Sequence, residues 1–133
     1  VLMLQAEVAE RIAAEPGQMS YLSVFVQYHA EVGVALRVPA AAFEPEPAVD
    51  SAVVVLRPRP ATPLEPALED ALWRRVQAGF RERRKMLRNV LVRQLPYPSE
   101  RVEGALAAAG IAGDRRPQTL AVGEWLRLRE ALG

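Results

Sequence analysis

A proline-rich link from Arg57 to Pro63 divides the chain into two parts with different patterns. Three of its seven residues are proline, which can neither continue a helix nor donate to a strand ladder. Before the link, β-branched runs alternate with helical periodicity, as is typical of the α/β class. After it, only helical spacing remains. The sequence therefore predicts two regions, residues 1–60 with strands and helices, and residues 61–133 with helices alone.

The first region is expected to contain three strands and two helices. Val1–Leu4 has the pattern of a buried strand and leads into a helical segment from Gln5 to Glu15. Val32–Val38 and Ser51–Leu56 are rich in β-branched residues and predict two further strands. Ser20 to Tyr28 is interpreted as a short helix capped by the serine, although its spacing would also suit a strand.

The second region is expected to contain three helices. Thr62-Pro-Leu-Glu65 has the form of a capping box with proline at the first helical position, and apolar spacing continues from there to about Leu95. Ser99 begins a second helix, which Gly110 ends. A last helix is predicted from Val122 to Leu132.

Positive charge is concentrated in one stretch, although the net charge of the chain is only +1. Between Arg74 and Arg93 lie eight basic residues against only Glu82, a net of +7, so the remainder carries −6. Such a field favours a polyanionic partner, and arginine suits bidentate contacts with phosphate and stacking on bases. The other interpretation is a solvated helix face.

Composition excludes several kinds of chemistry. The chain has no Cys and one His, His29, so it has no disulfide, no thiolate nucleophile and no multi-histidine metal site. We therefore expect no metal site. No apolar run approaches the roughly 20 residues that span a bilayer, and a cytoplasmic setting is the default expectation.

The loop from Pro39 to Asp50 presents one aromatic ring, Phe43. Its three prolines predict a rigid, extended segment that joins neither neighbouring strand. An aromatic ring held at the end of a strand offers a stacking surface worth about 1–3 kcal/mol per base. On the residues alone, a ring that plugs the core beneath the loop is an equally good interpretation.

Four stretches together resemble one family, the KsgA/RsmA small-subunit rRNA adenine dimethyltransferases, which are related to the Erm enzymes. Phe43 to Ser51 resembles the family's F-x-P-x-P-x-V-D/N-S signature, and Phe80 to Asn89 its F-x-x-R-R-K-x-L-R-N helix. Arg115 to Leu120 is similar to a segment before the last helix, and Met3 to Ala9 to an M-L-Q-K-E-V-A element. The resemblance runs along the whole chain.

The resemblance implies the C-terminal part of such an enzyme. Residues 1–60 would then form an α/β remnant, the last three strands and helices of a Rossmann-like methyltransferase sheet with the final strand inserted antiparallel between the other two. Residues 61–133 would form a small all-α RNA-binding domain. The family places its glycine-rich S-adenosylmethionine loop and its N-L-P-Y motif upstream of the M-L-Q element, so no cofactor is expected to bind this fragment.

Site residues follow from both arguments. The resemblance assigns Phe43 to support of the target adenine. The basic stretch and the Arg-Arg segment assign seven residues to RNA phosphates, namely Arg81, Arg83, Arg84, Lys85, Arg88, Arg115 and Arg116. Arg74 and Arg75 are weaker candidates for the same role. On one continuous helix, residues three or four apart share a face, so Arg81, Arg84, Lys85 and Arg88 would form a stripe, with Arg83 pointing elsewhere.

The leading hypothesis is an rRNA adenine N6,N6-dimethyltransferase that uses S-adenosylmethionine in its intact form and acts on small-subunit rRNA or a 30S-type particle during ribosome biogenesis. The fragment alone is predicted to be inactive. The alternatives are a non-catalytic nucleic-acid-binding, assembly or transcription factor on the same fold, and a helical adaptor with a basic face. An unpaired sheet edge at Val1–Leu4 also predicts self-association.

Overall fold

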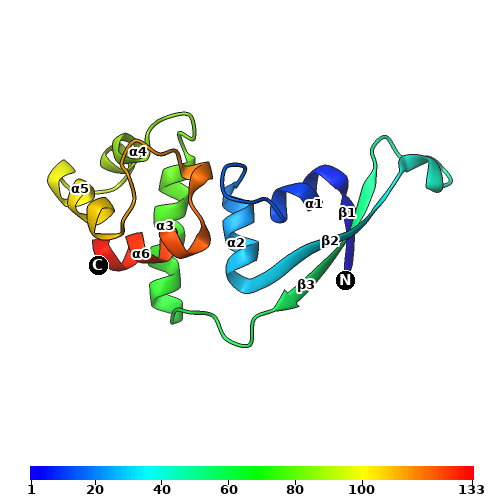
Figure 1. Cartoon of the computed structure of the whole chain (residues 1–133), viewed down its shortest axis with the longest axis horizontal. Coiled ribbons are helices and arrows are strands. Elements are labelled where there is room, and N and C mark those ends of the chain that lie inside the picture. Colours follow the sequence, from blue (N-terminus) through cyan, green and yellow to red (C-terminus); the bar gives the residue numbers. More distant parts are fainter.

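Three strands form an antiparallel sheet at one end of the molecule (Figure 1), in the order β1-β3-β2. The computed structural model describes all 133 residues. Strand β1 spans Leu2–Gln5, β2 Ala30–Val38 and β3 Ser51–Pro58. The last strand pairs with both others, Met3 opposite Val53 and Val32 opposite Leu56. The predicted insertion of the final strand between the other two is confirmed.

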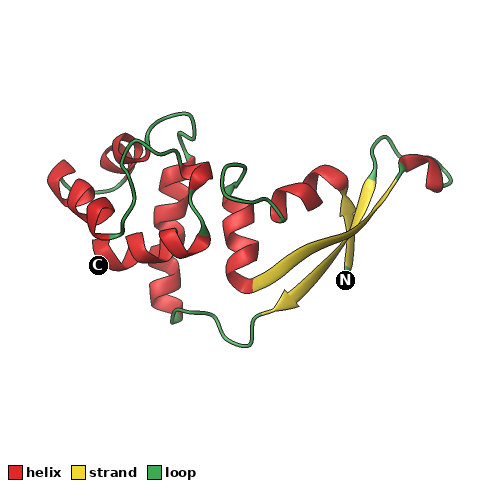
Figure 2. Ribbon diagram, viewed as in Figure 1, coloured by secondary structure: helices red, strands yellow, loops and turns green.

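Two helices cover one face of this sheet, as Figure 2 shows. Helix α1 spans Ala6–Ile12 and α2 spans Tyr21–His29. Ala9 and Ile12 bury against Ala52 and Val54 of β3 to form a small core of four buried residues. The other face of the sheet has no covering element, and Met3 and Leu36 are 54% and 53% exposed there.

Ser20 starts helix α2 as predicted. Its hydroxyl accepts from the Ser23 amide, while the Ser23 hydroxyl accepts from the Ser20 amide at 3.0 Å. This reciprocal arrangement satisfies two amides that the first helical turn leaves free. The helical interpretation of this segment is therefore confirmed over the strand alternative.

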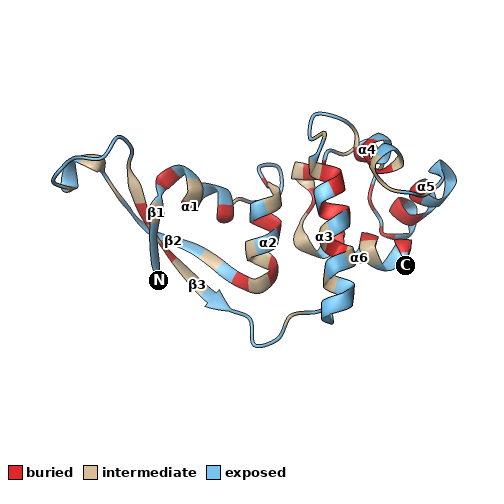
Figure 3. Cartoon of the chain, turned by 180° about the vertical axis from the view of Figure 1, so that it is seen from behind, coloured by how far each residue is buried: buried red, intermediate tan, exposed pale blue.

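The remaining helices pack around a larger core of 17 buried residues, and Figure 3 shows buried positions in red on the faces that these helices turn toward one another. They are α3 at Pro66–Phe80, α4 at Leu87–Gln94, α5 at Ser99–Ala108 and α6 at Val122–Leu132, with a 3-10 turn at Pro117–Thr119. Trp125 lies at the centre of this core and is fully buried. Val24 and Tyr28 of α2 also belong to it, so α2 joins the sheet to the helices. None of the six α-helices combines the length and apolarity that a membrane span requires.

The single long helix predicted up to Leu95 is wrong, because the chain breaks into a turn at residues 81–86. Met86, the residue before α4, has an extended backbone conformation with ψ of 137°. The Leu87 amide donates to the Arg115 carbonyl at 2.7 Å, and the Arg88 amide to the Gly113 carbonyl at 3.1 Å. These long-range bonds replace the helical bonds that the periodicity implied.

Two smaller expectations are also wrong. Helix α3 begins at Pro66 with Glu65 before it, so the capping box at Thr62 does not form. The Leu64 amide instead donates to the Tyr28 hydroxyl at 3.2 Å, which ties this segment to α2. The Pro39–Asp50 loop is not extended throughout, since Ala40–Ala42 makes one 3-10 turn.

Candidate nucleic-acid interface

Asp50 holds the two ends of the Phe43 loop together. Its Oδ1 accepts from the Ala40 amide at 2.9 Å, and its Oδ2 accepts from Arg37 Nε at 3.4 Å. The Ala40 amide, followed by Arg37, lowers the pKa of the Asp50 carboxyl. The Asp50 carbonyl also accepts from the Ala6 amide at 2.9 Å, so the loop is fixed to the start of α1.

Phe43 lies half-buried at the edge of the sheet. Its ring borders a shallow hollow of about 310 Å³ whose other lining residues are Met3, Leu4, Gln5, Pro45, Pro47 and Ser51. The ring is outside both buried cores. Part of it therefore faces solvent beside the carboxyl end of β1, where a planar ligand could stack on it.

The turn between α3 and α4 carries the densest positive charge. We name residues Arg81–Lys85 the basic turn. Arg83, Arg84 and Lys85 are exposed, and no carboxylate lies within 4.0 Å of their charged groups. The predicted stripe of Arg81, Arg84, Lys85 and Arg88 assumed one continuous helix. Because the chain forms a turn here, that geometry is wrong, and helical spacing no longer separates Arg83 from the other cations.

Glu82 is the one acid of the basic turn, and it pairs with Arg93 of α4. Arg93 Nε and Nη2 donate to its two carboxylate oxygens at 3.0 and 2.9 Å. This hydrogen bonding by Arg93 lowers the pKa of Glu82. The pair neutralises Glu82 and leaves its neighbouring cations without an acidic partner.

The fold brings the second arginine segment beside the basic turn. The Leu87 and Arg88 amides bond to residues 113–115, so Arg116 lies near the start of α4. Arg88 and Arg116 are exposed and have no ion pair. Arg115 is different, because its guanidinium donates to both oxygens of Glu124 and to the Thr119 carbonyl.

Arg75 is buried and makes only internal contacts, so the suggestion that it binds phosphate is wrong. It is 6% exposed and donates to the Ala71 carbonyl at 2.9 Å, the Tyr97 hydroxyl at 3.0 Å and the Gly133 carbonyl at 3.2 Å. Arg74, its neighbour in sequence, is exposed. Helical position alone separates the two roles.

Sequence reasoning missed one further hollow, of about 350 Å³, which we name the aromatic hollow. It is lined by Tyr21 of α2 and by Gln77, Phe80 and Arg81 at the end of α3. Its two aromatic residues lie 59 positions apart in the sequence, and only their clustering in space makes a site. The only local sequence feature that pointed to this hollow is that Phe80 directly precedes the basic residues Arg81–Lys85.

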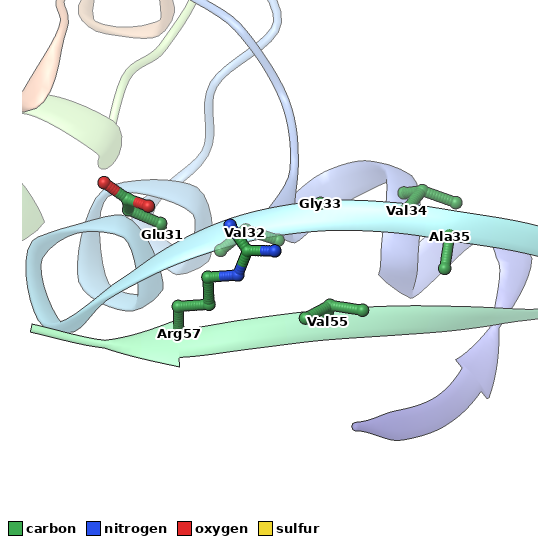
Figure 4. Close-up of a pocket in the computed structure, with 7 residues that line it drawn as sticks. All are labelled: Glu31, Val32, Gly33, Val34, Ala35, Val55 and Arg57. Carbon is green, nitrogen blue, oxygen red and sulfur yellow. The ribbon is translucent and has the colours of Figure 1, made fainter.

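A different hollow, of about 290 Å³, lies over β2 and β3 (Figure 4). Its walls are mostly backbone and apolar side chains such as Val32 and Val55. The Arg57 side chain reaches over β2 toward Val32, and the Glu31 carboxylate points away from the Arg57 guanidinium. The Glu31 carboxylate instead lies 4.0 Å from the Arg59 guanidinium. The hollow contains no nucleophile paired with a base, so it offers no catalytic arrangement.

Comparison with known proteins decides the family. The model of a family described as ribosomal RNA adenine dimethylase matches residues 1–132. The chain belongs to this family. The resemblance that the motifs suggested is therefore confirmed.

Curated members of the dimethylase family align along the whole chain. "Ribosomal RNA small subunit methyltransferase A" of Levilactobacillus brevis is 44% identical, with 98% of this chain and 46% of the relative covered. The protein of the same name from Anaeromyxobacter dehalogenans strain 2CP-C is 46% identical over 100% of this chain and 47% of its own length. The chain thus spans about half the length of the curated relatives it matches.

Solved structures show the same fold. The crystal structure of the 23S rRNA methyltransferase ErmE matches with a TM-score of 0.75 at 32% identity, covering 98% of this chain and 52% of that one. A dimethyladenosine transferase from Plasmodium falciparum matches with a TM-score of 0.78 at 24% identity, over 96% and 54% of the two chains. The second likeness concerns the fold alone.

Proposed function

We propose that this chain is the RNA-binding part of an S-adenosylmethionine-dependent enzyme that dimethylates the N6 amine of adenosines in small-subunit rRNA. The family match over residues 1–132 carries the proposal. In the cytoplasm, the intact protein would act on a 30S-type particle during ribosome biogenesis. Strands β1, β2 and β3 would complete a Rossmann-like sheet, and residues 61–133 would form the RNA-binding domain.

The proposed role of Phe43 is to support the target adenine. Methyl transfer to an exocyclic amine requires the amine to point in line with the departing group, so positioning dominates the chemistry. The donor supplies an already activated methyl group. A half-buried ring beside the end of β1, on a loop closed by Asp50, can hold a base by stacking without acting as an acid or a base.

The basic turn and its neighbours are proposed to bind RNA phosphates. The footprint comprises Arg81, Arg83, Arg84, Lys85, Arg88, Arg115 and Arg116. Arg115 lies at its border, where the Glu124 pair holds the segment that carries Arg116. Phosphate contacts supply affinity without reading sequence, and A-form RNA is recognised largely by shape.

The residues of this chain do not fit a site for the methyl donor. Donor loops of Rossmann-like folds need glycines between a strand and a helix so that the backbone can approach the ligand closely. Here β1 passes directly into α1 at Gln5–Ala6, and no glycine lies between them. We propose that the donor site belongs to the part of the relatives' length that this chain does not match.

A chimera tests this function. The chain would replace the matching segment of the Levilactobacillus brevis relative, and incorporation of labelled methyl groups into unmethylated small subunits would be measured. We expect dimethyladenosine to form with the chimera and its yield to fall by roughly five- to a hundredfold with Phe43→Ala, the value of one stacked base. A chimera that folds and binds the donor yet never methylates rRNA would count against the proposal, whereas Glu46→Ala, an exposed change in the same loop, serves as control.

A further inference from the structure

The aromatic hollow has no role in the function proposed above. It opens between the first residue of α2 and the last turn of α3, two helices that lie side by side in opposite directions (Figure 1). It is a shallow, open depression of about 350 Å³, which suits a planar group that stacks on the surface rather than a ligand that is enclosed. Arg81 belongs both to its rim and to the basic turn.

The two rings of the hollow are fixed from behind by other aromatic residues. The Tyr21 ring meets the edge of Trp73 at 6.0 Å and stacks with Phe25 at 6.2 Å between ring centres. The Phe80 ring lies 5.9 Å from that of the fully buried Trp125. Both rings are half-buried. A planar ligand would therefore meet surfaces that need little ordering on binding.

The polar groups of the hollow suit the edge and the charge of a nucleotide. Gln77 presents an exposed amide, which both donates and accepts hydrogen bonds. Arg81 Nη1 donates to Gln94 Oε1 at 2.9 Å, which holds the guanidinium at the rim. No carboxylate lines the hollow, so nothing there repels a phosphate. Burial raises the pKa of the Tyr21 hydroxyl, and its hydrogen bond with Gln77 partly offsets this effect.

We propose that the aromatic hollow binds one unpaired nucleobase of the RNA whose phosphates contact the basic turn. The base would lie against Tyr21 and Phe80, with its edge toward Gln77. An apolar side chain of a protein partner fits less well, because it would gain nothing from the Arg81 guanidinium and the Gln77 amide, which both stay exposed at the rim. This inference rests on the proposed RNA-binding function and adds to it a site that selects RNA with a bulge or an open loop.

The test compares two hairpin RNAs that differ by one bulged adenosine, using fluorescence anisotropy with the 133-residue chain. We expect the bulged hairpin to bind more tightly. Tyr21→Ala should lower the affinity for the bulged hairpin by roughly five- to a hundredfold, the value of one stacked base. The same change should alter the affinity for the fully paired hairpin little. Tyr21→Phe keeps the ring and should bind like the unaltered chain. Leu22→Ala, at an exposed neighbour outside the hollow, is the matched control.

Failure of this inference and failure of the proposed function give different results. If Arg84→Ala leaves the affinity for both hairpins unchanged, the RNA-binding function itself is contradicted. If Arg84→Ala weakens both, yet Tyr21→Ala costs the bulged hairpin no more than the paired one, only the base site is overturned.

If Tyr21→Ala lowers the melting temperature, its loss of affinity could come from unfolding, so photocrosslinking of the unaltered chain provides a second test. The unaltered chain would be irradiated with a hairpin that carries 5-iodouridine at the bulge, and the adduct would be mapped by mass spectrometry. A crosslink to Tyr21 or Phe80 supports the base site. A crosslink found only at other residues overturns it.

Discussion

Arg115 and Arg83 are both arginines of the proposed RNA footprint, yet their surroundings differ. Arg115 donates to Glu124, to the Thr119 carbonyl and to the Thr119 hydroxyl, whereas no carboxylate lies within 4.0 Å of Arg83. The hydrogen bond from Arg115 lowers the pKa of Glu124, and the same pair raises that of Arg115. Arg115 therefore stabilises the fold, while the charge of Arg83 remains free for a ligand.

Glu124→Gln should remove this stabilisation in a pH-dependent way. The folded-state pKa of Glu124 lies below its unfolded value, so its contribution is present above about pH 4.3, the ordinary glutamate pKa, and is lost as the pH falls through the lower folded value. We expect a loss of roughly 1–2 kcal/mol at pH 7. Urea unfolding at pH 7 and near pH 3 measures it. Glu130→Gln is the control, because Glu130 lies on the same helix without an ion pair, and it should change the free energy of unfolding little. A destabilisation by Glu124→Gln that is the same at both pH values would contradict a stabilising role for the Arg115–Glu124 pair.

Gly79→Ala should destabilise the protein, although alanine favours helices. A Cβ at Gly79 would lie 2.6 Å from Cη2 of Trp125, a ring that is fully buried and has no room to move. Overpacking of this kind costs about 1–3 kcal/mol. Gly104→Ala is the matched control, because a Cβ there meets nothing within 4 Å and should stabilise α5 by about 0.5–1 kcal/mol. Thermal unfolding followed by circular dichroism distinguishes the two, and equal melting temperatures would contradict this account.

Among the elements, the break between α3 and α4 shows where sequence periodicity stops being sufficient. Phe80 and Leu87 are seven residues apart, as on one face of a continuous helix, but the Leu87 and Arg88 amides bond to a segment more than 20 residues away. Such long-range bonds leave no local trace in the sequence. By contrast, Ser20, Gly110 and the bounds of the last helix were predicted correctly, because their capping and turn chemistry is local.

The break changes which arginines should matter for RNA. On a continuous helix Arg83 would lie off the cationic face, but in the basic turn both Arg83 and Arg84 are exposed. We expect Arg83→Ala and Arg84→Ala to weaken RNA binding similarly, each reducing the slope of log affinity against log salt by about 1. Filter binding at several salt concentrations measures this. Arg93→Ala should have a smaller effect because Glu82 already neutralises it, and a much weaker effect of Arg83 than of Arg84 would restore the helical stripe.

Across the whole molecule, the sequence predicted the strands and their order better than the site. Strand order followed from a family resemblance, and the β-branched runs identified the strands themselves. The aromatic hollow could not be predicted in this way, since Tyr21 and Phe80 meet only after α2 has packed against α3. Arg75 likewise gave no sign of burial beside the exposed Arg74.

The uncovered sheet face predicts self-association of the chain. Met3 and Leu36 both pair with Val53 and lie on the face opposite α1 and α2, where each is more than half exposed. Apolar faces of this kind mark interaction surfaces. We expect sedimentation velocity to show concentration-dependent dimers or larger species, which Leu36→Lys should reduce. Leu68→Lys, an exposed apolar position on α3, should not, and a monomer at high concentration would contradict the prediction.

The salt dependence of RNA binding tests the central claim most directly, namely that the basic turn and its neighbours hold RNA through its phosphates. Affinity for a small-subunit rRNA fragment would be measured from low to moderate salt. With five or six free cations at the interface, each contributing about −0.7 to −0.9, we predict a slope of roughly −4 to −5 in log affinity against log salt. A slope near zero, or one that is the same after Arg83, Arg84 and Lys85 are all changed to Ala, would contradict the account.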